Sequence, residues 1–477
     1  MSITSRLLAI AAVSALTAAT AVPAMALENE FHGMFAVRGY NSNYLSGTAG
    51  RLIIGNEAVA PAVSGDSVKT NNWIEQRARI FYSAKANDNL KLVTGFELDS
   101  YWGKGSYDNL GGRNQGGALG SDTVSIETKW TYLDFNCPIT GTNFKVGMQG
   151  LNDGYKGLIT GLGADASGVL ASKSIGPFSG SLGWFRLDDS NSATRTTTSF
   201  TNGKSARDLW MASGNVNVTK DVKVGASYYF LNDDNVPSTN LDGINVTSDY
   251  NVHILGASAA ANLGPVALDA FGIYEFGTAN RGTAFVPNQT HISAYAGNVA
   301  AKVKAGPATV KANGLYVSGN STINQVGGNS FVSVNNTTSA VGAENGMAAL
   351  GGLYLLVRNP KETTNEQAIV SESSNRDQGL IAAAVGVDLA IDKFFASSNV
   401  GAAFTAKKAS NRNTYIGTEI NGEIGYKLYD NMSALVRASY VVLGDYYNNK
   451  AGLQATPATQ SDPANPYEAQ LVLSYTF

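Results

Sequence analysis

The last eleven residues, Tyr467–Phe477, read YEAQLVLSYTF and decide the fold class. Counted back from Phe477, every second side chain is apolar or aromatic, and most of those between are polar. Period-two alternation puts the two sets on opposite faces of a β-strand. An apolar face with aromatic ends, opposite a polar face, is typical of a tilted strand that crosses a bilayer with lipid outside and water inside.

The start of the chain has the features of a secretory signal peptide. Arg6 precedes an apolar run from Leu7 to Val22, and small residues surround a cleavage site after Ala26. We expect residues 1–26 to be removed and residues 27–477 to form one β-barrel domain. Removal of Arg6 leaves 33 basic against 37 acidic side chains, a near balance that argues against a nucleic-acid partner.

Short and long connections alternate along the rest of the chain. Short turns such as Gly264-Pro265 separate alternating strands, and long stretches rich in Gly, Asn and Ser lie between them. This rhythm is typical of a transmembrane antiparallel β-barrel with short periplasmic turns and long extracellular loops. We predict an all-β barrel of about 18 strands, with 16 to 20 possible. Residues 319–377 form a long extracellular loop insertion in this prediction, and the apolar segment 347–357 is either a loop element folded into the lumen or an extra hairpin.

Residues 127–162 carry a sharper pattern. They read ETKWTYLDFNCPITGTNFKVGMQGLNDGYKGLITGL, a strand, a short turn, a second strand ending in Val-Gly-Met-Gln and a Gly-rich loop. With the terminal Phe477, this resembles the general diffusion porins of the Gram-negative outer membrane. The resemblance implies a homotrimer in outer-membrane lipid whose third loop folds inward and constricts the pore. The chain departs from the family pattern in length, because typical members have 16 strands.

The resemblance also implies a set of pore-lining residues. The constricting loop would be 150–162 and would offer an acid, a tyrosine and a lysine to the lumen, opposite a basic cluster on strands 1–3. The acids on those strands leave a second interpretation open, in which the wall is a solvated face that pairs with itself. The predicted residues are Arg38, Glu75, Arg77, Arg79, Glu97, Asp99, Asp153, Tyr155 and Lys156.

The predicted function is a porin that passes small hydrophilic solutes and ions passively. One alternative is a substrate-specific channel, for example an anion-selective one using Lys302, Lys304 and Lys311. Another is a barrel that sheaths a partner cytochrome, which requires a wide lumen without a constricting loop. We expect no enzyme activity, cofactor or metal, because His32 and the other two histidines lie far apart and no Cys-x-x-Cys-His motif occurs.

Overall fold

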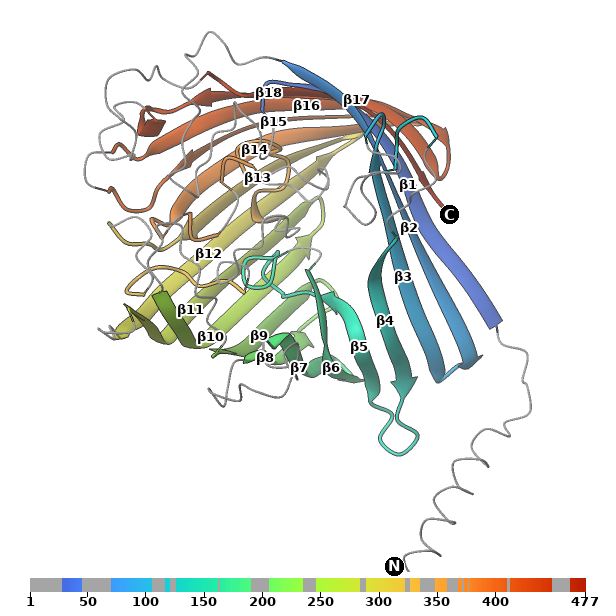
Figure 1. The fold of residues 1–477 in the computed structure, drawn as a ribbon, viewed down its shortest axis with the longest axis vertical. Helices are drawn as coiled ribbons and strands as arrows, with labels where there is room; N and C mark the ends of the chain where they lie inside the picture. Colours follow the sequence, from blue (N-terminus) through green and yellow to red (C-terminus); the bar gives the residue numbers. More distant parts are fainter. Residues whose placement is uncertain are drawn as a thin grey trace, which may run out of the picture.

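The fold is known for the greater part of the chain (Figure 1). The predicted signal peptide, residues 1–26, lies outside the described residues. The computed structural model describes residues 28–44, 70–104, 116–120, 126–161, 164–189, 206–234, 246–283, 289–321, 327–334, 348–357, 368–370, 373–375, 377–409, 412–447 and 464–477.

The described residues form one antiparallel sheet of 18 strands. Each strand pairs with its neighbours in the chain, and β1 also pairs with β18, so the sheet closes into a barrel. This confirms the predicted fold class and strand number. The strands are β1 (Glu28–Ser42), β2 (Asn71–Asn87), β3 (Leu90–Tyr101), β4 (Ile126–Asn136), β5 (Asn143–Leu151), β6 (Ala164–Ile175), β7 (Phe178–Asp189), β8 (Ala206–Asn217), β9 (Val222–Asp233), β10 (Val246–Leu263), β11 (Val266–Thr283), β12 (Gln289–Ala305), β13 (Ala308–Val317), β14 (Leu380–Ile391), β15 (Phe394–Phe404), β16 (Tyr415–Tyr429), β17 (Met432–Leu443) and β18 (Tyr467–Thr476).

The terminal strand completes the barrel at a seam with β1. Their register runs from Met34 opposite Thr476 to Ser42 opposite Glu468. At its end the Gly33 N–H donates to the Phe477 carbonyl over 2.9 Å, and the Phe477 N–H donates back over 3.1 Å. A Cβ on Gly33 would lie 2.5 Å from the Phe477 ring, so only glycine leaves room for the terminal aromatic side chain.

The lengths of the connections sort to the two ends of the barrel, as the sequence predicts. Two-residue turns such as Gly264-Pro265 and Gly306-Pro307 lie at one end, and long connections such as 318–379 lie at the other. The segment 347–357 contributes a short 3-10 helix, Ala348–Leu350, rather than an extra hairpin among the described residues. No helix in the described part of the chain is long and apolar enough to span a membrane.

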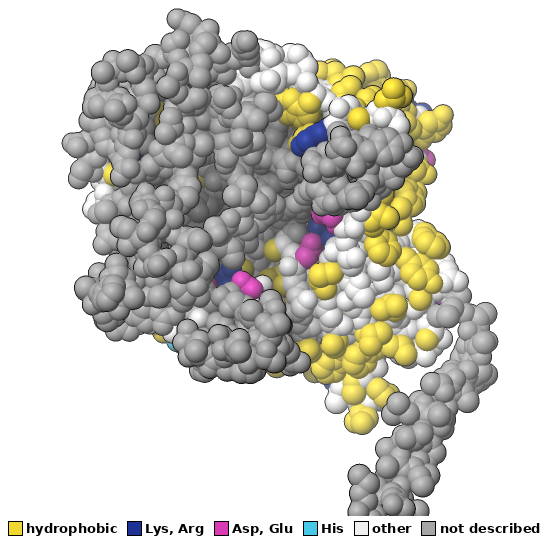
Figure 2. Space-filling model, viewed as in Figure 1, with side chains coloured by type: hydrophobic (Ala, Val, Ile, Leu, Met, Phe, Trp, Pro, Cys, Tyr) yellow, Lys and Arg dark blue, Asp and Glu magenta, His cyan; other side chains and the backbone are white. Residues whose placement is uncertain are grey.

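The outer face of the barrel is apolar. In β18, Leu471 is 62% exposed whereas Glu468 on the opposite face is 3% exposed, as the alternation predicts. Figure 2 shows hydrophobic side chains gathered on the outer surface at the right, over the first strands. Aromatic rings stack along the outside, with His253 lying 4.7 Å from Phe230 and 5.0 Å from Phe276 between ring centroids. A closed barrel with this surface is an outer-membrane protein.

The outer face provides a test of membrane placement. Val436 lies near the middle of β17 and Val442 near its end, and both side chains are about half exposed. We expect Val436→Arg to lower the free energy of unfolding in lipid by about 2–4 kcal/mol and Val442→Arg by about 0–1 kcal/mol, because the cost of a charge depends on its depth. Urea titration in phospholipid vesicles measures both, and equal costs would contradict the assigned depth.

Candidate functional site

The predicted wall residues on β1, β2 and β3 come together as a ladder of ion pairs. Arg38 lies opposite Glu75 across β1 and β2, with 3.4 Å between Nη1 and Oε1. Arg77 lies opposite Asp99 across β2 and β3, with Nε 2.8 Å from Oδ1 and Nη2 2.9 Å from Oδ2. Three strands therefore present alternating charges on their inner face.

The ladder continues through Glu97, which bridges two arginines. Its Oε1 lies 3.1 Å from Nη2 of Arg77, and its other oxygen pairs with Nε of Arg79. Tyr40 donates to Glu75 over 3.2 Å. Three arginines thus stand among three acids in contact with them, which matches the interpretation of a wall that pairs with itself.

The loop after β5 folds into the lumen, but the carboxylate of Asp153 accepts hydrogen bonds from the backbone of the same loop. One oxygen of Asp153 accepts from the N–H groups of Tyr155 and Gly157, over 2.7 and 3.0 Å. The other accepts from Ile159 and Thr160, over 2.8 and 2.7 Å. Asp153 therefore organises the compact loop 152–161, which differs from the expected role of facing the arginines across the pore.

Tyr155 attaches this loop to the wall formed by β9, β10 and β11. Its hydroxyl lies 2.5 Å from Oγ of Ser227, and its ring meets Tyr229 and Phe271 edge-on at centroid distances of 6.4 and 5.4 Å. A Cβ on Gly256 would lie 2.2 Å from the Tyr155 hydroxyl, so this glycine provides the space that the tyrosine occupies.

Lys156 anchors the loop to the same side of the barrel. Its ammonium pairs with Asp269 on β11 and donates to Oδ1 of Asn298 on β12 over 2.9 Å. The nine predicted residues thus form two groups. The first group is the ladder on β1–β3, and the second is a loop fastened to β9–β12.

Parts of the connection between β13 and β14 also lie inside the barrel, as Figure 1 shows. The backbone N–H groups of Tyr354, Leu355 and Leu356 donate to the carboxylate of Glu419 on β16, over 2.7, 3.0 and 2.6 Å. Val332 donates to Glu275 on β11 over 2.8 Å. The range 319–377 was predicted as a long extracellular loop insertion whose segment 347–357 is a loop element folded into the lumen or an extra hairpin, and these contacts place described segments of it against the inner wall.

The two inward loops pack on each other as well as on the barrel. The N–H of Val334 donates to the carbonyl of Ile159 over 2.7 Å. Side chains of both loops and of the wall form one buried apolar cluster, in which Leu158, Ile159 and Leu356 have no exposed surface. Much of the lumen beside β7–β16 is therefore filled with packed chain.

Sequence reasoning missed the two glutamates that hold the longer loop. Glu275 and Glu419 are completely buried, although each looks in the sequence like an ordinary lumen-facing acid. Lys311, from the predicted lysine track, lies opposite Lys302 and reaches Oδ1 of Asp388 over 2.5 Å. Lys311 therefore has an acidic partner on the neighbouring strand β14.

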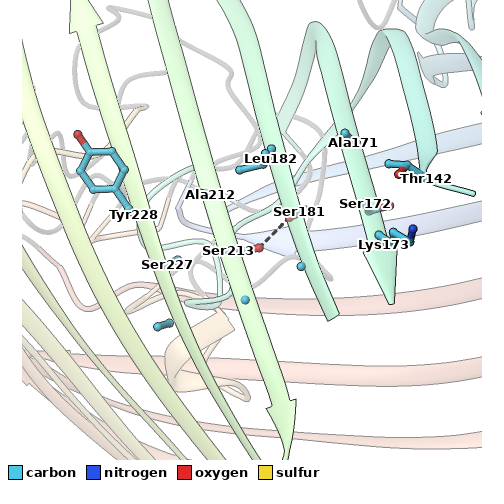
Figure 3. A pocket seen from close by; sticks show the side chains of 13 residues that line it. Thr142, Ala171, Ser172, Lys173, Ser181, Leu182, Ala212, Ser213, Ser227 and Tyr228 are labelled. Atoms are coloured by element: carbon cyan, nitrogen blue, oxygen red, sulfur yellow. Dashed lines mark hydrogen bonds between the residues drawn. The ribbon is translucent and has the colours of Figure 1, made fainter. Parts of the chain in front are cut away.

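A shallow depression lies elsewhere on the described part of the barrel. It has a volume of about 740 Å³ and is lined by residues of β6–β9 that include Ala171, Leu182, Ala212 and Tyr228. Figure 3 shows these side chains with the hydrogen bond between Ser181 and Ser213, 2.7 Å long. The surface that this depression exposes is mostly apolar, so we assign it to the barrel surface rather than to the ionic passage.

The carboxylate of Glu419 gives a test of loop anchoring. Glu419→Gln replaces one acceptor oxygen with an amide nitrogen, and the loop N–H groups that lose a partner cost about 1–3 kcal/mol. We expect segment 352–357 to leave the wall more often and the single-channel conductance to become larger and noisier. Glu28→Gln at the exposed start of β1 is the control, and a recording indistinguishable from wild type would contradict the anchoring role.

Comparisons with known proteins agree with the fold. No family model and no curated protein matches the chain. OccK8 (OprE) of Pseudomonas aeruginosa has a TM-score of 0.54 at 12% identity, covering 94% of this chain and 98% of that one. OccAB1 of Acinetobacter baumannii has a TM-score of 0.53 at 12% identity, covering 94% and 96%. OpdK of Pseudomonas aeruginosa, solved with vanillate, has a TM-score of 0.52 at 10% identity, covering 94% and 98%. The chain is an 18-stranded outer-membrane β-barrel similar in fold to these proteins.

Proposed function

We propose that the protein is an outer-membrane channel that passes small hydrophilic solutes and ions selectively through a narrowed lumen. The observation that carries this proposal is the filling of the lumen by two inward loops, fastened through Lys156, Glu275 and Glu419 to the wall. A barrel of 16 to 18 strands otherwise encloses a wide aqueous channel. A narrowed channel selects solutes by width and by the charges that line it.

The passage that this arrangement favours runs along β1–β3. Both loops rest on β9–β16, and the ion-pair ladder lies on the other side of the barrel (Figure 1). Among the ladder residues, the side chain of Arg79 keeps 23% of its surface exposed and that of Arg38 keeps 12%. Solutes on this route would meet fixed charges on one side and the packed loops on the other.

Selective transport fits the observations better than general diffusion. The strand number is 18 rather than the 16 typical of the general diffusion porins that the sequence resembles. The similar protein OpdK was solved with vanillate, a small aromatic acid. A small organic acid is therefore the first solute to test for transport through this barrel. Homotrimeric assembly stays a prediction.

The alternative of a sheath around a partner cytochrome fits less well. A sheath requires a lumen wide enough for a folded protein domain. Segments 152–161 and 352–357 occupy that space, and their backbone groups bond to the chain's own carboxylates. Removing segment 352–357 would leave buried Glu419 with only its wall donors, Asn421 and Ser439, and the loss of three backbone donors costs free energy.

Single-channel recording tests the proposal directly. We expect small ohmic steps from wild type, and slower liposome swelling as the sugar in the medium becomes larger. The double variant Tyr155→Ala, Lys156→Ala frees the loop from β9–β12 and should raise both the conductance and the size limit. Lys427→Ala with Tyr429→Ala, two exposed residues of β16, is the matched control. Large, weakly selective steps from wild type would instead indicate a general diffusion porin.

The ladder gives a second test, of ion selectivity. Arg77→Gln with Arg79→Gln removes two positive charges and keeps the three acids, so the wall becomes net negative. We expect the reversal potential in a salt gradient to shift toward cation selectivity. Arg186→Gln, at the outer end of β7, is the control. Because breaking buried ion pairs can destabilise by about 3–5 kcal/mol, heat-modifiable migration must first confirm a folded barrel. An unchanged potential in a folded variant would remove the ladder from the ion path.

A further inference from the structure

A buried arginine at the loop end of the barrel has no charged partner among the residues that the structure describes. Arg412 lies in the connection between β15 and β16, and 8% of its surface is exposed. Within the described residues its guanidinium has no hydrogen bond or ion pair, and Nη2 is completely buried. Its contact is with the face of Tyr446, whose ring centroid lies 5.0 Å away. A cation–π contact offsets only part of the cost of removing a guanidinium from water.

A second unpartnered donor lies on the same tyrosine. Gln378, just before β14, has no exposed surface, and its Oε1 accepts from the Tyr446 hydroxyl over 2.6 Å. Its Nε2 is buried and has no acceptor among the described residues. Tyr446 therefore contacts the Arg412 guanidinium with its ring face and the Gln378 amide with its hydroxyl. Nη2 of Arg412 and Nε2 of Gln378 both remain without an acceptor within the described residues.

A hydroxyl group from the connection after β15 completes the cluster. Thr405 is 2% exposed, and its Oγ1 has no partner within the described residues. The backbone fixes it beside Gln378, because Lys407 donates to the Gln378 carbonyl over 3.0 Å and Ala406 to the Gly379 carbonyl over 3.3 Å. Two connections thus carry three unsatisfied polar side chains, and Tyr446 after β17 contacts two of them, Arg412 and Gln378. Buried polar groups in folded proteins are normally satisfied, so the cluster requires an explanation.

The charge of the connection between β15 and β16 indicates which ligand would satisfy these groups. Residues 405–414 read TAKKASNRNT, with three basic residues and no acid. Lys407 and Lys408 are exposed and would attract an anion toward Arg412. A guanidinium and a hydroxyl on one connection, with an amide nitrogen on another, suit an anion with more than two oxygens better than a carboxylate.

We propose that Arg412, Gln378 and Thr405 form a binding site for a small tetrahedral oxyanion of the phosphate type. The site lies at the end of the barrel that carries the long connections, on strands other than those of the β1–β3 ladder. Gln378 ends the connection whose earlier segments fold into the lumen, and Tyr446 belongs to the buried apolar cluster around the inward loops. The site does not depend on the proposed channel function. The bound anion would fasten the connection before β14 to the connection between β15 and β16, and both already contact Tyr446 after β17.

Calorimetric titration of the purified barrel with inorganic phosphate tests the site. We expect saturable binding to wild type, and at least a tenfold weaker affinity for Arg412→Gln, which keeps a polar side chain of similar width but removes the charge. Lys407→Gln removes an equal charge from the same connection at an exposed position and should change the affinity far less. Thr405→Val keeps the shape and charge, so it tests the site independently if Arg412→Gln does not fold.

Several outcomes would overturn the site. Absence of phosphate binding to wild type would do so, and so would equal weakening by Arg412→Gln and Lys407→Gln, which would indicate diffuse attraction. Acetate is the competing probe, and acetate binding as tight as phosphate binding would overturn the tetrahedral assignment. Because binding is measured without transport, its failure would leave the conductance tests of the channel unaffected.

Discussion

The closed hydrogen-bonded sheet is the constraint on which the rest of the structure depends. A bilayer offers no water to backbone N–H and C=O groups, so a sheet in lipid must have no free edge. Here β1 and β18 meet in continuous register, and the reciprocal bonds between Gly33 and Phe477 extend the pairing to the last residue. The terminal aromatic residue therefore belongs to the closure itself. A barrel closed by 18 strands has a wide interior. The chain must cover the inner wall with polar side chains or occupy the space with its own loops.

The chain fills part of that interior with its own loops, which creates a second hydrogen-bonding problem. Loop backbone brought inside a barrel carries N–H groups that lose water. Carboxylates solve this problem three times, since the half-buried Asp153 and the buried Glu275 and Glu419 accept from N–H groups of the loops. Each carboxylate has several lone pairs, and the donors in turn stabilise its charge. The polar anchors and the apolar cluster around them therefore support each other.

The sequence predicts those parts of the structure that depend on local pattern. Alternation assigns the two faces of each strand, so the sequence predicts that the ladder residues share the inner face. Their exact pairing also depends on a register shift between Lys85 and Asn87, next to the turn at Asp88-Asn89, which brings Arg77 opposite Asp99. The loop anchors were not predictable, because Glu419 and Tyr354 are 65 residues apart and Glu275 and Val332 are 57 apart, with no periodic relation between them. A lumen acid that holds a loop looks the same in the sequence as one that faces water.

The role of Asp153 shows why a family pattern predicts a loop better than it predicts the contacts of that loop. The Gly-rich loop after β5 folds inward, yet its acid bonds to four backbone N–H groups and its lysine reaches Asp269. A transverse field requires unbalanced charge on facing walls. The ladder contains as many acids as arginines, and the facing loop is compensated as well. We infer that width and local dipoles, rather than one strong field across the lumen, govern what passes this barrel.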